Sequence, residues 1–271
     1  MVDNPLRLDA YLKRIHYDGQ LTASVETLCR LHRAQVMSIP FENLNLFMGR
    51  PIQLDPASIV AKLIGEHRGG YCHELNGLFL MVLQDLGFTV TPLAARVFNG
   101  ETFGQKSHQL TLVEIRGRPW LADVGFGSNG LIEAIPLELE SEFPQHLDTF
   151  RLRADAELGF VLQHKLADRW RDLYAFSLQE QYPADYQMMN YRTSTSPTSL
   201  FTQHIVCTFS TDDTRITLYD DELKIRRLDE TVTTSLEGKG VYRETLQRCF
   251  GIVLPPGTRL QSPHSLFSIV L

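Results

Sequence analysis

The sequence predicts an α+β protein, because the spacing of its apolar residues changes along the chain. In residues 1–87 they recur every three or four positions, which is the period of an amphipathic helix. From residue 88 the period becomes two, which is typical of half-buried strands. Residues 190–271 contain both periods. We therefore expect a helical unit at 1–87, a β unit at 88–189 and an α/β unit at 190–271.

Four helices are predicted in the first unit. A helical spacing marks the first two, with Leu8, Tyr11, Leu12 and Ile15 in one and Val25, Leu28, Cys29 and His32 in the other. The third follows Asp55-Pro56, an N-cap residue with proline at the first helical position, and ends at Gly65. The fourth begins near Cys72 and ends at Gly87. It is so densely apolar that we expect it at the centre of the protein.

In the second unit the alternating pattern predicts two strands around a turn at residues 116–119, and further short strands between residues 150 and 178. Residues 190–199 are polar and contain a proline, which predicts a linker or an ordered loop. This segment separates the second unit from the third.

The third unit is predicted to be mixed. A turn at Asp220-Asp221 brings two apolar pairs face to face, with Ile216 and Leu218 opposite Leu223 and Ile225. An amphipathic helix follows and ends at Gly251; its apolar residues are Tyr242, Leu246, Cys249 and Phe250.

The chain has 271 residues and a formal net charge of -6. It contains no run of Lys and Arg, which argues against a nucleic-acid surface, because such surfaces bind by neutralising phosphates. No apolar run approaches the roughly 18 residues that cross a bilayer, and residues 1–17 carry charges that a signal peptide would lack. We therefore expect a cytoplasmic protein with no nucleic-acid or membrane partner, either a monomer or a homodimer.

One of the four cysteines stands out. Cys72 follows the turn Arg68-Gly69-Gly70-Tyr71 and begins an apolar helix, where unpaired N–H groups and the positive end of the helix dipole stabilise a thiolate. It is therefore the candidate nucleophile. The spacing of the cysteines predicts neither a disulfide framework nor a metal site, and core positions are expected for Cys29, Cys207 and Cys249.

A cysteine nucleophile needs a base, and the base needs a third group that fixes its tautomer. His108 opens one predicted strand and Asp123 closes the next, where a carboxylate among apolar residues needs a partner. A regular hairpin turning at 116–119 would place Asp123 opposite Leu112, roughly 13 Å along the strand from His108 at about 3.3 Å per residue. The pairing therefore requires a bulge, a bend or a different register.

Other histidines offer no comparable constellation. His73 is adjacent to Cys72, and adjacent residues on a helix do not face each other. Surface or packing roles are expected for His16, His32, His146, His164, His204 and His264.

Residues 125–130 match the Gly-x-Gly-x-x-Gly pattern of dinucleotide-binding loops. That interpretation fails, because Pro136 prevents a long helix from following and the preceding strand lies in an antiparallel context. The glycines instead indicate a tight turn whose backbone N–H groups approach an anion.

Taken together, four motifs make the chain resemble the bacterial arylamine N-acetyltransferase family. They are Tyr11-Leu12-Lys13-Arg14-Ile15, Ile39-Pro40-Phe41-Glu42-Asn43-Leu44, Arg68-Gly69-Gly70-Tyr71-Cys72-His73-Glu74-Leu75-Asn76 and Ala122-Asp123-Val124-Gly125-Phe126-Gly127. The resemblance implies a helical bundle, a central antiparallel β-barrel and an α/β lid around a papain-like or transglutaminase-like cysteine core. It also implies acetyl-CoA-dependent acetylation of arylamines and arylhydrazines by a ping-pong mechanism.

The same resemblance assigns roles to individual residues. It implies that Cys72 is the nucleophile, His108 its base and Asp123 the carboxylate that orients the base. Coenzyme A (CoA) contacts are implied for Gly125, Phe126, Gly127, Ser128 and Phe201. Contacts with the aromatic acceptor are implied for Phe41, Val97, Phe126 and Phe201. Glu42 and Arg68 are implied to form a pair that supports the turn before Cys72.

Acetyl-CoA would act as a co-substrate, with no tightly bound cofactor and no metal. Three alternatives stay open at this stage. A papain-like or transglutaminase-like cysteine amide hydrolase would use water as the acceptor, and an amide synthase of the same superfamily would join an amine to a bound acyl chain. A protein that binds CoA or an aromatic ligand without catalysis would have no use for the thiol of Cys72.

Overall fold

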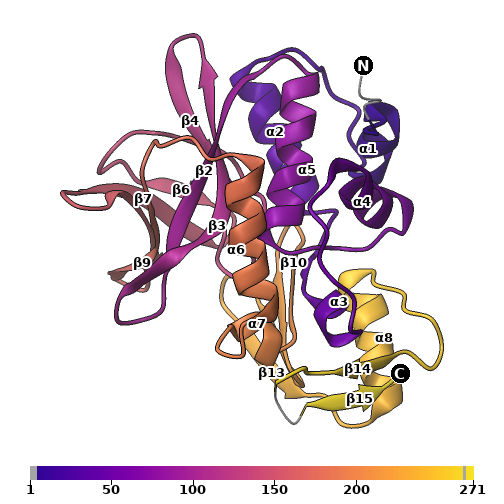
Figure 1. Cartoon of the computed structure of the whole chain (residues 1–271). Coiled ribbons are helices and arrows are strands. Elements are labelled where there is room, and N and C mark those ends of the chain that lie inside the picture. Colours follow the sequence, from indigo (N-terminus) through magenta and orange to yellow (C-terminus); the bar gives the residue numbers. More distant parts are fainter. Residues whose placement is uncertain (1–4, 265–266) are drawn as a thin grey trace.

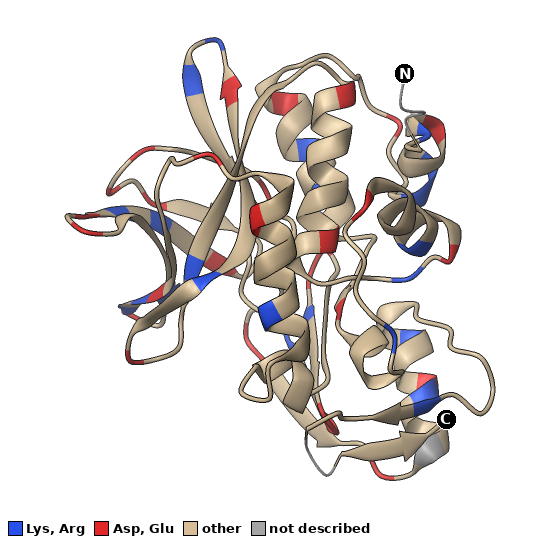
Figure 2. Ribbon diagram, viewed as in Figure 1, with Lys and Arg blue, Asp and Glu red and all other residues tan. Residues whose placement is uncertain are grey.

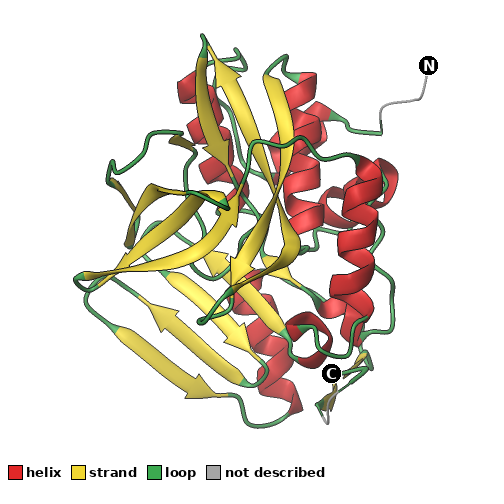
Figure 3. Cartoon of the chain, turned by 60° about the vertical axis from the view of Figure 1, so that its left-hand side comes forward, coloured by secondary structure: helices red, strands yellow, loops and turns green. Residues whose placement is uncertain are grey.

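The computed structural model describes residues 5–264 and 267–271, and it confirms the predicted α+β class. Figures 1 and 3 show helices from the first third of the chain packed beside a strongly curved sheet from its middle. A smaller sheet and one helix from the last third lie below them in Figure 1.

The first part of the chain is helical, as predicted. Its helices are α1 Leu8–Arg14, α2 Val25–Val36, a short α3 Leu44–Phe47, α4 Pro56–Val60, the π-helical turn η1 Ala61–Gly65 and α5 Cys72–Asp85. The Asp55 carboxylate caps α4 by accepting a hydrogen bond from the Ser58 N–H at 3.0 Å. The helix predicted as far as Gly65 is therefore present, although its second half is π-helical.

Helix α5 is the centre of the molecule, as its composition predicted. Its buried residues cover most of its circumference, and it packs against α4 and against the neighbouring strands β2 Thr89–Phe98 and β3 Phe103–Ile115. Gly87 has φ +77°, a conformation that glycine adopts without strain, and the helix ends just before it. The nucleophile candidate therefore begins the most buried helix of the fold.

An eight-stranded antiparallel sheet forms a nearly closed barrel, in the order β5-β4-β3-β2-β9-β8-β7-β6. Its buried face holds a separate apolar core that includes Leu93, Leu110, Phe150, Leu162 and Phe176. Besides β2 and β3, its strands are β4 Arg118–Ala122, β5 Ile135–Pro136, β6 Phe143–Gln145, β7 Asp148–Asp155, β8 Gly159–Leu166 and β9 Arg169–Phe176.

The hairpin between β3 and β4 corrects the predicted turn at 116–119. The turn consists of Arg116 and Gly117 alone, with φ +52° and +74°, and Ile115 pairs with Arg118. A two-residue turn with both φ values positive matches the twist of the flanking strands. Because Thr111 pairs with Ala122, the next position, Asp123, is level with Leu110 instead of Leu112. This register brings Asp123 two residues closer to His108 than predicted.

A five-stranded antiparallel sheet of order β1-β10-β11-β12-β13 joins a strand from the helical part to four strands from the last third of the chain. Its first strand, β1 Phe41–Glu42, comes from the helical part and pairs with β10 Val206–Ser210. The predicted pairs Ile216 with Ile225 and Leu218 with Leu223 are both present. The other strands of this sheet are β11 Arg215–Tyr219, β12 Glu222–Arg226 and β13 Thr231–Ser235.

The predicted C-terminal helix is α8 Lys239–Phe250, and it ends at Gly251 with φ +66°. A hairpin of β14 Arg259–Gln261 and β15 Ser268–Val270 follows. Cys207 is buried in β10, as expected, while Cys29 and Cys249 are half-buried at the edge of the core.

The prediction of a linker or loop at 190–199 is wrong for the first half of that segment, because helix α6 spans Pro183–Thr195. Pro183 is at the first helical position, and the Asp185 carboxylate accepts a hydrogen bond from the Tyr182 N–H at 2.8 Å. The polar composition reflects an exposed helix instead of a linker. A short loop then leads to α7 Leu200–Gln203. The division of the chain at residues 87 and 189 stays a prediction, and the second position lies inside α6.

Basic and acidic residues are interspersed over the helices and strands in Figure 2. Within the described part of the chain, no helix is both long enough and apolar enough to cross a membrane.

Candidate active site

Cys72 is the first residue of α5, and it is 4% exposed. The turn before it lies against β1, where Phe41 forms a bridge with Gly70. A Cβ atom on Gly69 would lie 2.1 Å from the Pro40 carbonyl oxygen, so only glycine permits this close approach. The Cys72 thiol donates a hydrogen bond to the Ser107 carbonyl at 3.7 Å, which places it beside the strand that carries His108.

His108 and Asp123 are brought together by the β3–β4 register. His108 Nε2 is 2.7 Å from Asp123 Oδ2, and both side chains are almost fully buried. Burial alone would lower the pKa of His108, but Asp123 and then Cys72 outweigh it and raise that pKa to about 10. The sequence could not settle this pairing, because it depends on the two-residue turn. With Nε2 held by Asp123, Nδ1 is the ring nitrogen left for the thiol.

Three further residues hold Asp123 in place. Asn76 Nδ2 donates to Asp123 Oδ1 at 2.9 Å, and the Gly125 N–H donates to the same oxygen at 3.0 Å. The Asp123 N–H donates to His32 Nε2 at 3.0 Å. The carboxylate is thus fixed in orientation on both of its oxygens.

Sequence reasoning missed both Asn76 and His32. Asn76 had a usable signal, because it is four residues after Cys72 and therefore on the same face of α5. His32 had none, since only the tertiary fold brings it to Asp123 from another helix. Its ring also contacts the Ile132 carbonyl through Nδ1 at 2.9 Å, and burial lowers the pKa of His32 to about 4. The expected packing role for His32 therefore needs correction, because it supports the backbone of Asp123 as a neutral donor and acceptor.

A buried ionic network supports the turn before Cys72. Arg68 Nη2 lies 2.7 Å from Glu42 Oε1, and both side chains are almost completely buried. Lys62 Nζ lies 2.7 Å from Glu74 Oε1, while Glu74 Oε2 accepts a hydrogen bond from the Tyr71 N–H at 3.0 Å. Glu42 and Arg68 are therefore paired as the family resemblance implies. The second pair ties the π-helical turn to the start of α5.

A cavity of about 560 Å³ opens above Cys72 and His108. Its wall is mostly apolar and comes from five separate segments of the chain. The residues that line it are Phe41, Cys72, Val97, Phe98, Asn99, Gln105, Ser107, His108, Gly125, Phe126, Ser128, Arg192, Thr193, Thr198, Ser199, Leu200, Phe201 and Val206. All the residues implied for CoA and acceptor contacts are among them except Gly127.

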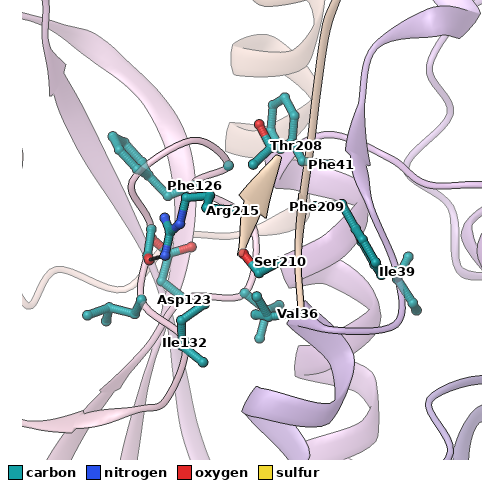
Figure 4. A pocket seen from close by; sticks show the side chains of 14 residues that line it. Val36, Ile39, Phe41, Asp123, Phe126, Ile132, Thr208, Phe209, Ser210 and Arg215 are labelled. Carbon is teal, nitrogen blue, oxygen red and sulfur yellow. Dashed lines mark hydrogen bonds between the residues drawn. The ribbon is translucent and has the colours of Figure 1, made fainter. Parts of the chain in front are cut away.

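Gly127 instead lines a small cavity of about 30 Å³ between its loop and β10, and this cavity shares Phe41 and Phe126 with the main one (Figure 4). Its φ is +80°, and a Cβ atom there would lie 3.2 Å from the Phe41 ring. Arg215 fixes the loop by donating from Nη1 to the Ser128 carbonyl at 2.5 Å and from Nη2 to the Gly130 carbonyl at 3.1 Å. No long helix directly follows the loop, as expected, so the dinucleotide-binding interpretation of the glycine pattern does not apply.

Gly125 is the position where the loop touches the nucleophile, so Gly125→Ala should disturb the site. The new Cβ atom would lie 2.7 Å from Asn76 Nδ2 and 3.0 Å from Cys72 Cα. We expect a loss of about 1–3 kcal/mol in the free energy of unfolding and a fall of up to about 10²-fold in acylation of Cys72. Urea unfolding and single-turnover acylation measure the two effects.

Gly104→Ala is the matched control, because its Cβ atom would only reach the Val97 carbonyl oxygen at 3.7 Å. It should leave both quantities close to their wild-type values. Wild-type acylation by Gly125→Ala would show that close contact between loop and helix is unnecessary.

Among the described residues, no group of three or more His, Cys, Asp or Glu side chains could hold a metal ion.

Comparison with known proteins identifies the family. A family model described as N-acetyltransferase matches residues 24–258. The arylamine N-acetyltransferase / N-hydroxyarylamine O-acetyltransferase of Salmonella typhimurium is 37% identical over 78% of this chain and 76% of its own. The arylamine N-acetyltransferase of Mycobacterium bovis is 34% identical over 91% of this chain and 89% of its own.

The solved structures agree with the sequences. Mycobacterium marinum arylamine N-acetyltransferase in complex with CoA has a TM-score of 0.86 and 35% identity, covering 91% of this chain and 93% of its own. The Salmonella typhimurium enzyme gives a TM-score of 0.86 at 32% identity, over 93% and 92% of the two chains. With the sequence match and the shared fold, this chain belongs to the arylamine N-acetyltransferase family.

Proposed function

We propose that the protein transfers an acetyl group from acetyl-CoA to arylamines and arylhydrazines through an acetyl-Cys72 thioester. The observation that carries the proposal is the position of Cys72 at the start of α5, in one cavity with a His108 whose other ring nitrogen is held by Asp123. This is the arrangement that nucleophilic catalysis by cysteine needs. Family membership supplies the donor and the acceptor class.

In the first half-reaction, His108 holds the proton of Cys72, and the thiolate attacks the thioester carbonyl of acetyl-CoA. The charge that develops on the carbonyl oxygen needs a donor, and the N–H of Cys72 at the helix start is the candidate. As the intermediate collapses, the bond to the CoA sulfur breaks. His108 returns its proton to that sulfur, and acetyl-Cys72 remains.

In the second half-reaction, the amine of the acceptor attacks the acetyl-Cys72 carbonyl. An aromatic amine is uncharged at neutral pH, so its lone pair is available without prior loss of a proton. Neutral His108 then takes the proton that the new amide must lose, and the Cys72 thiolate leaves. The apolar side chains of Phe41, Val97, Phe126 and Phe201 line the cavity and would enclose the aromatic ring.

The donor side of the cavity has a basic neighbour. A second cavity of about 270 Å³ is lined by Arg171, Arg215, Lys224 and Arg226, and it shares Ser128 with the main cavity. Arg215 and Arg226 both pair with the Asp148 carboxylate, which cancels one of their two positive charges, and Arg171 and Lys224 add two more. This charge supports binding of the CoA phosphates near the loop, with Gly125, Phe126, Gly127, Ser128 and Phe201 as the proposed CoA contacts.

The test is an intact-protein mass spectrum after addition of acetyl-CoA without an acceptor. We expect one added acetyl group, its removal on addition of an aromatic amine, and no adduct on Cys72→Ala. Cys29→Ala is the matched control and should still be acetylated, because burial raises the pKa of Cys29 to about 11 and keeps that thiol protonated.

Two outcomes would contradict the proposal. Continuous release of CoA without any amine would indicate a hydrolase, with water as the acceptor. Acetylation of Cys72→Ala to the same extent as wild type would show that another residue is the nucleophile.

A further inference from the structure

The main cavity has one basic residue on its wall besides the catalytic histidine. Among its described lining residues, only Arg192 carries a permanently charged side chain, and no carboxylate lines the cavity. Arg192 comes from the last turn of α6 and is exposed. Apart from the catalytic His108, this guanidinium is therefore the one basic group among the described lining residues of a mostly apolar pocket.

The partner of Arg192 is itself neutral. Arg192 Nη2 donates to Thr198 Oγ1 at 3.1 Å, and Thr198 also lines the cavity. In the described residues Arg192 forms no ion pair with Asp or Glu, unlike Arg68 and Arg153. A guanidinium has five N–H donors, so this single bond leaves most of its donors available to a ligand.

We propose that Arg192 makes the enzyme prefer acceptors whose aromatic ring carries a carboxylate. The inference rests on the proposed function: the amine of the acceptor points to acetyl-Cys72, and the carboxylate at the other end of the ring binds the guanidinium. Arginine and carboxylate form two parallel hydrogen bonds, which fix orientation as well as affinity. Because the wall carries no acidic group, it offers nothing that would favour a cationic acceptor.

The phosphates of the donor are the other anions that could enter this site. They have a separate basic cavity, which contains Arg171 and Lys224 and shares only Ser128 with the main cavity. Arg192 does not line that cavity. The position of Arg192 therefore favours the acceptor as its ligand.

Arg192 has a purely structural alternative role, since a cation in the last turn of a helix interacts favourably with the helix dipole. That role would affect the stability of α6 without distinguishing one acceptor from another. The two roles therefore differ in acceptor selectivity.

The experiment isolates acetyl-Cys72 and measures its second-order discharge by 4-aminobenzoate and by the uncharged methyl ester of 4-aminobenzoate. In Arg192→Gln we expect a loss of about 10- to 100-fold with the acid, as for a lost hydrogen bond to a charged group, and less than about twofold with the ester. With the acid, Arg192→Lys should discharge at a rate between those of the wild type and Arg192→Gln, because it keeps the charge and loses the second hydrogen bond.

Arg248→Gln is the matched control, because Arg248 is an exposed arginine in the last turn of α8 and does not line the cavity. It should discharge to both acceptors at the wild-type rate. Acylation of Cys72 is measured separately with acetyl-CoA and with 4-nitrophenyl acetate, a donor without phosphates.

Three results would overturn the proposal. Equal losses with the acid and the ester would mean that Arg192 does not bind the carboxylate. Slower acylation by acetyl-CoA alone, with normal discharge, would assign Arg192 to the donor phosphates. Failure of the wild-type enzyme to form acetyl-Cys72 from either donor would overturn the proposed function and this inference with it.

Discussion

Replacing Asp123 by asparagine should lower the rate of Cys72 acetylation by about 10³- to 10⁴-fold, by analogy with other nucleophile–histidine–carboxylate sites. The hydrogen bonds around Asp123 explain why. Its Oδ1 accepts from Asn76 Nδ2 at 2.9 Å and from the Gly125 N–H at 3.0 Å. In the variant the amide oxygen has to occupy that position, because an NH₂ group there would face two donors. The amide NH₂ then points at His108.

This orientation reverses the tautomer of His108. Nε2 now has to accept a hydrogen bond from the asparagine NH₂, so the proton of the neutral ring moves to Nδ1. Nδ1 is the nitrogen left for Cys72, and once it carries a proton it cannot take one from the thiol. The variant also loses the negative charge that raises the pKa of His108 to about 10, so the imidazolium is no longer stabilised beside the thiolate.

The measurements are single-turnover acetylation and alkylation of Cys72 by iodoacetamide as a function of pH. In the wild type the pKa of about 10 keeps His108 positively charged through neutral pH, so a cation lies beside Cys72. In Asp123→Asn alkylation at neutral pH should be much slower and should need a higher pH. Acetylation at the wild-type rate would remove Asp123 from the mechanism.

The same pair makes stability depend on pH, which gives an independent readout. The folded pKa of His108 lies above its ordinary value of 6.5. The stabilisation by the pair is therefore complete below about pH 6.5 and is lost as the pH rises towards 10. Asp123→Asn should lack this loss, as measured by urea unfolding at several pH values.

The helical part of the fold could be read from the sequence because its signals are local. Asp55 and Pro56 mark the start of α4, and Gly87 and Gly251 mark the ends of α5 and α8 through positive φ angles. The polar face of α6 misled the prediction, because an exposed helix and a linker have similar composition. Its start signal at Pro183 was the better guide.

The site could be predicted only in part, because its geometry depends on contacts between distant segments. The difference between a turn at 116–119 and one at Arg116-Gly117 moves Asp123 by two residues along its partner strand, which decides whether it reaches His108. His32 comes from a helix 91 residues before Asp123. Its role needed tertiary information, whereas Asn76 could have been found from helical spacing.

Replacing Arg68 by methionine should destabilise the fold by about 3–5 kcal/mol, because it leaves a buried carboxylate without its main partner. Glu42 is fully buried, and Arg68 contacts its Oε1 through Nε at 3.0 Å and through Nη2 at 2.7 Å. The Leu44 N–H also donates to Glu42 Oε2 at 2.7 Å, and Lys62 Nζ lies 3.9 Å from Oε1. A neutral N–H and a lysine that already pairs with Glu74 at 2.7 Å cannot replace a guanidinium.

The double variant Glu42→Gln with Arg68→Met should recover part of that loss, because it removes the unpaired charge and keeps an oxygen for the Leu44 N–H. Arg7→Met is the matched control. Arg7 pairs with Asp9 at the surface, where the two side chains are 78% and 69% exposed, and the change should stay below about 1 kcal/mol. Urea unfolding at constant pH measures all three variants.

The pH dependence of Arg68→Met follows from the sign of the pKa shift. Burial alone would raise the pKa of Glu42, and Arg68 and Lys62 outweigh it and hold that pKa below 4.5 in the wild type. Removing Arg68 lets burial dominate, so the pKa of Glu42 should rise above 4.5. Wild-type stability then falls as pH drops through the depressed pKa, whereas the variant gains from protonation of Glu42. The difference in stability between the wild type and the variant should therefore be largest near neutral pH and should shrink on acidification. A difference that does not depend on pH would mean that lost packing, not the unpaired charge, destabilises the variant.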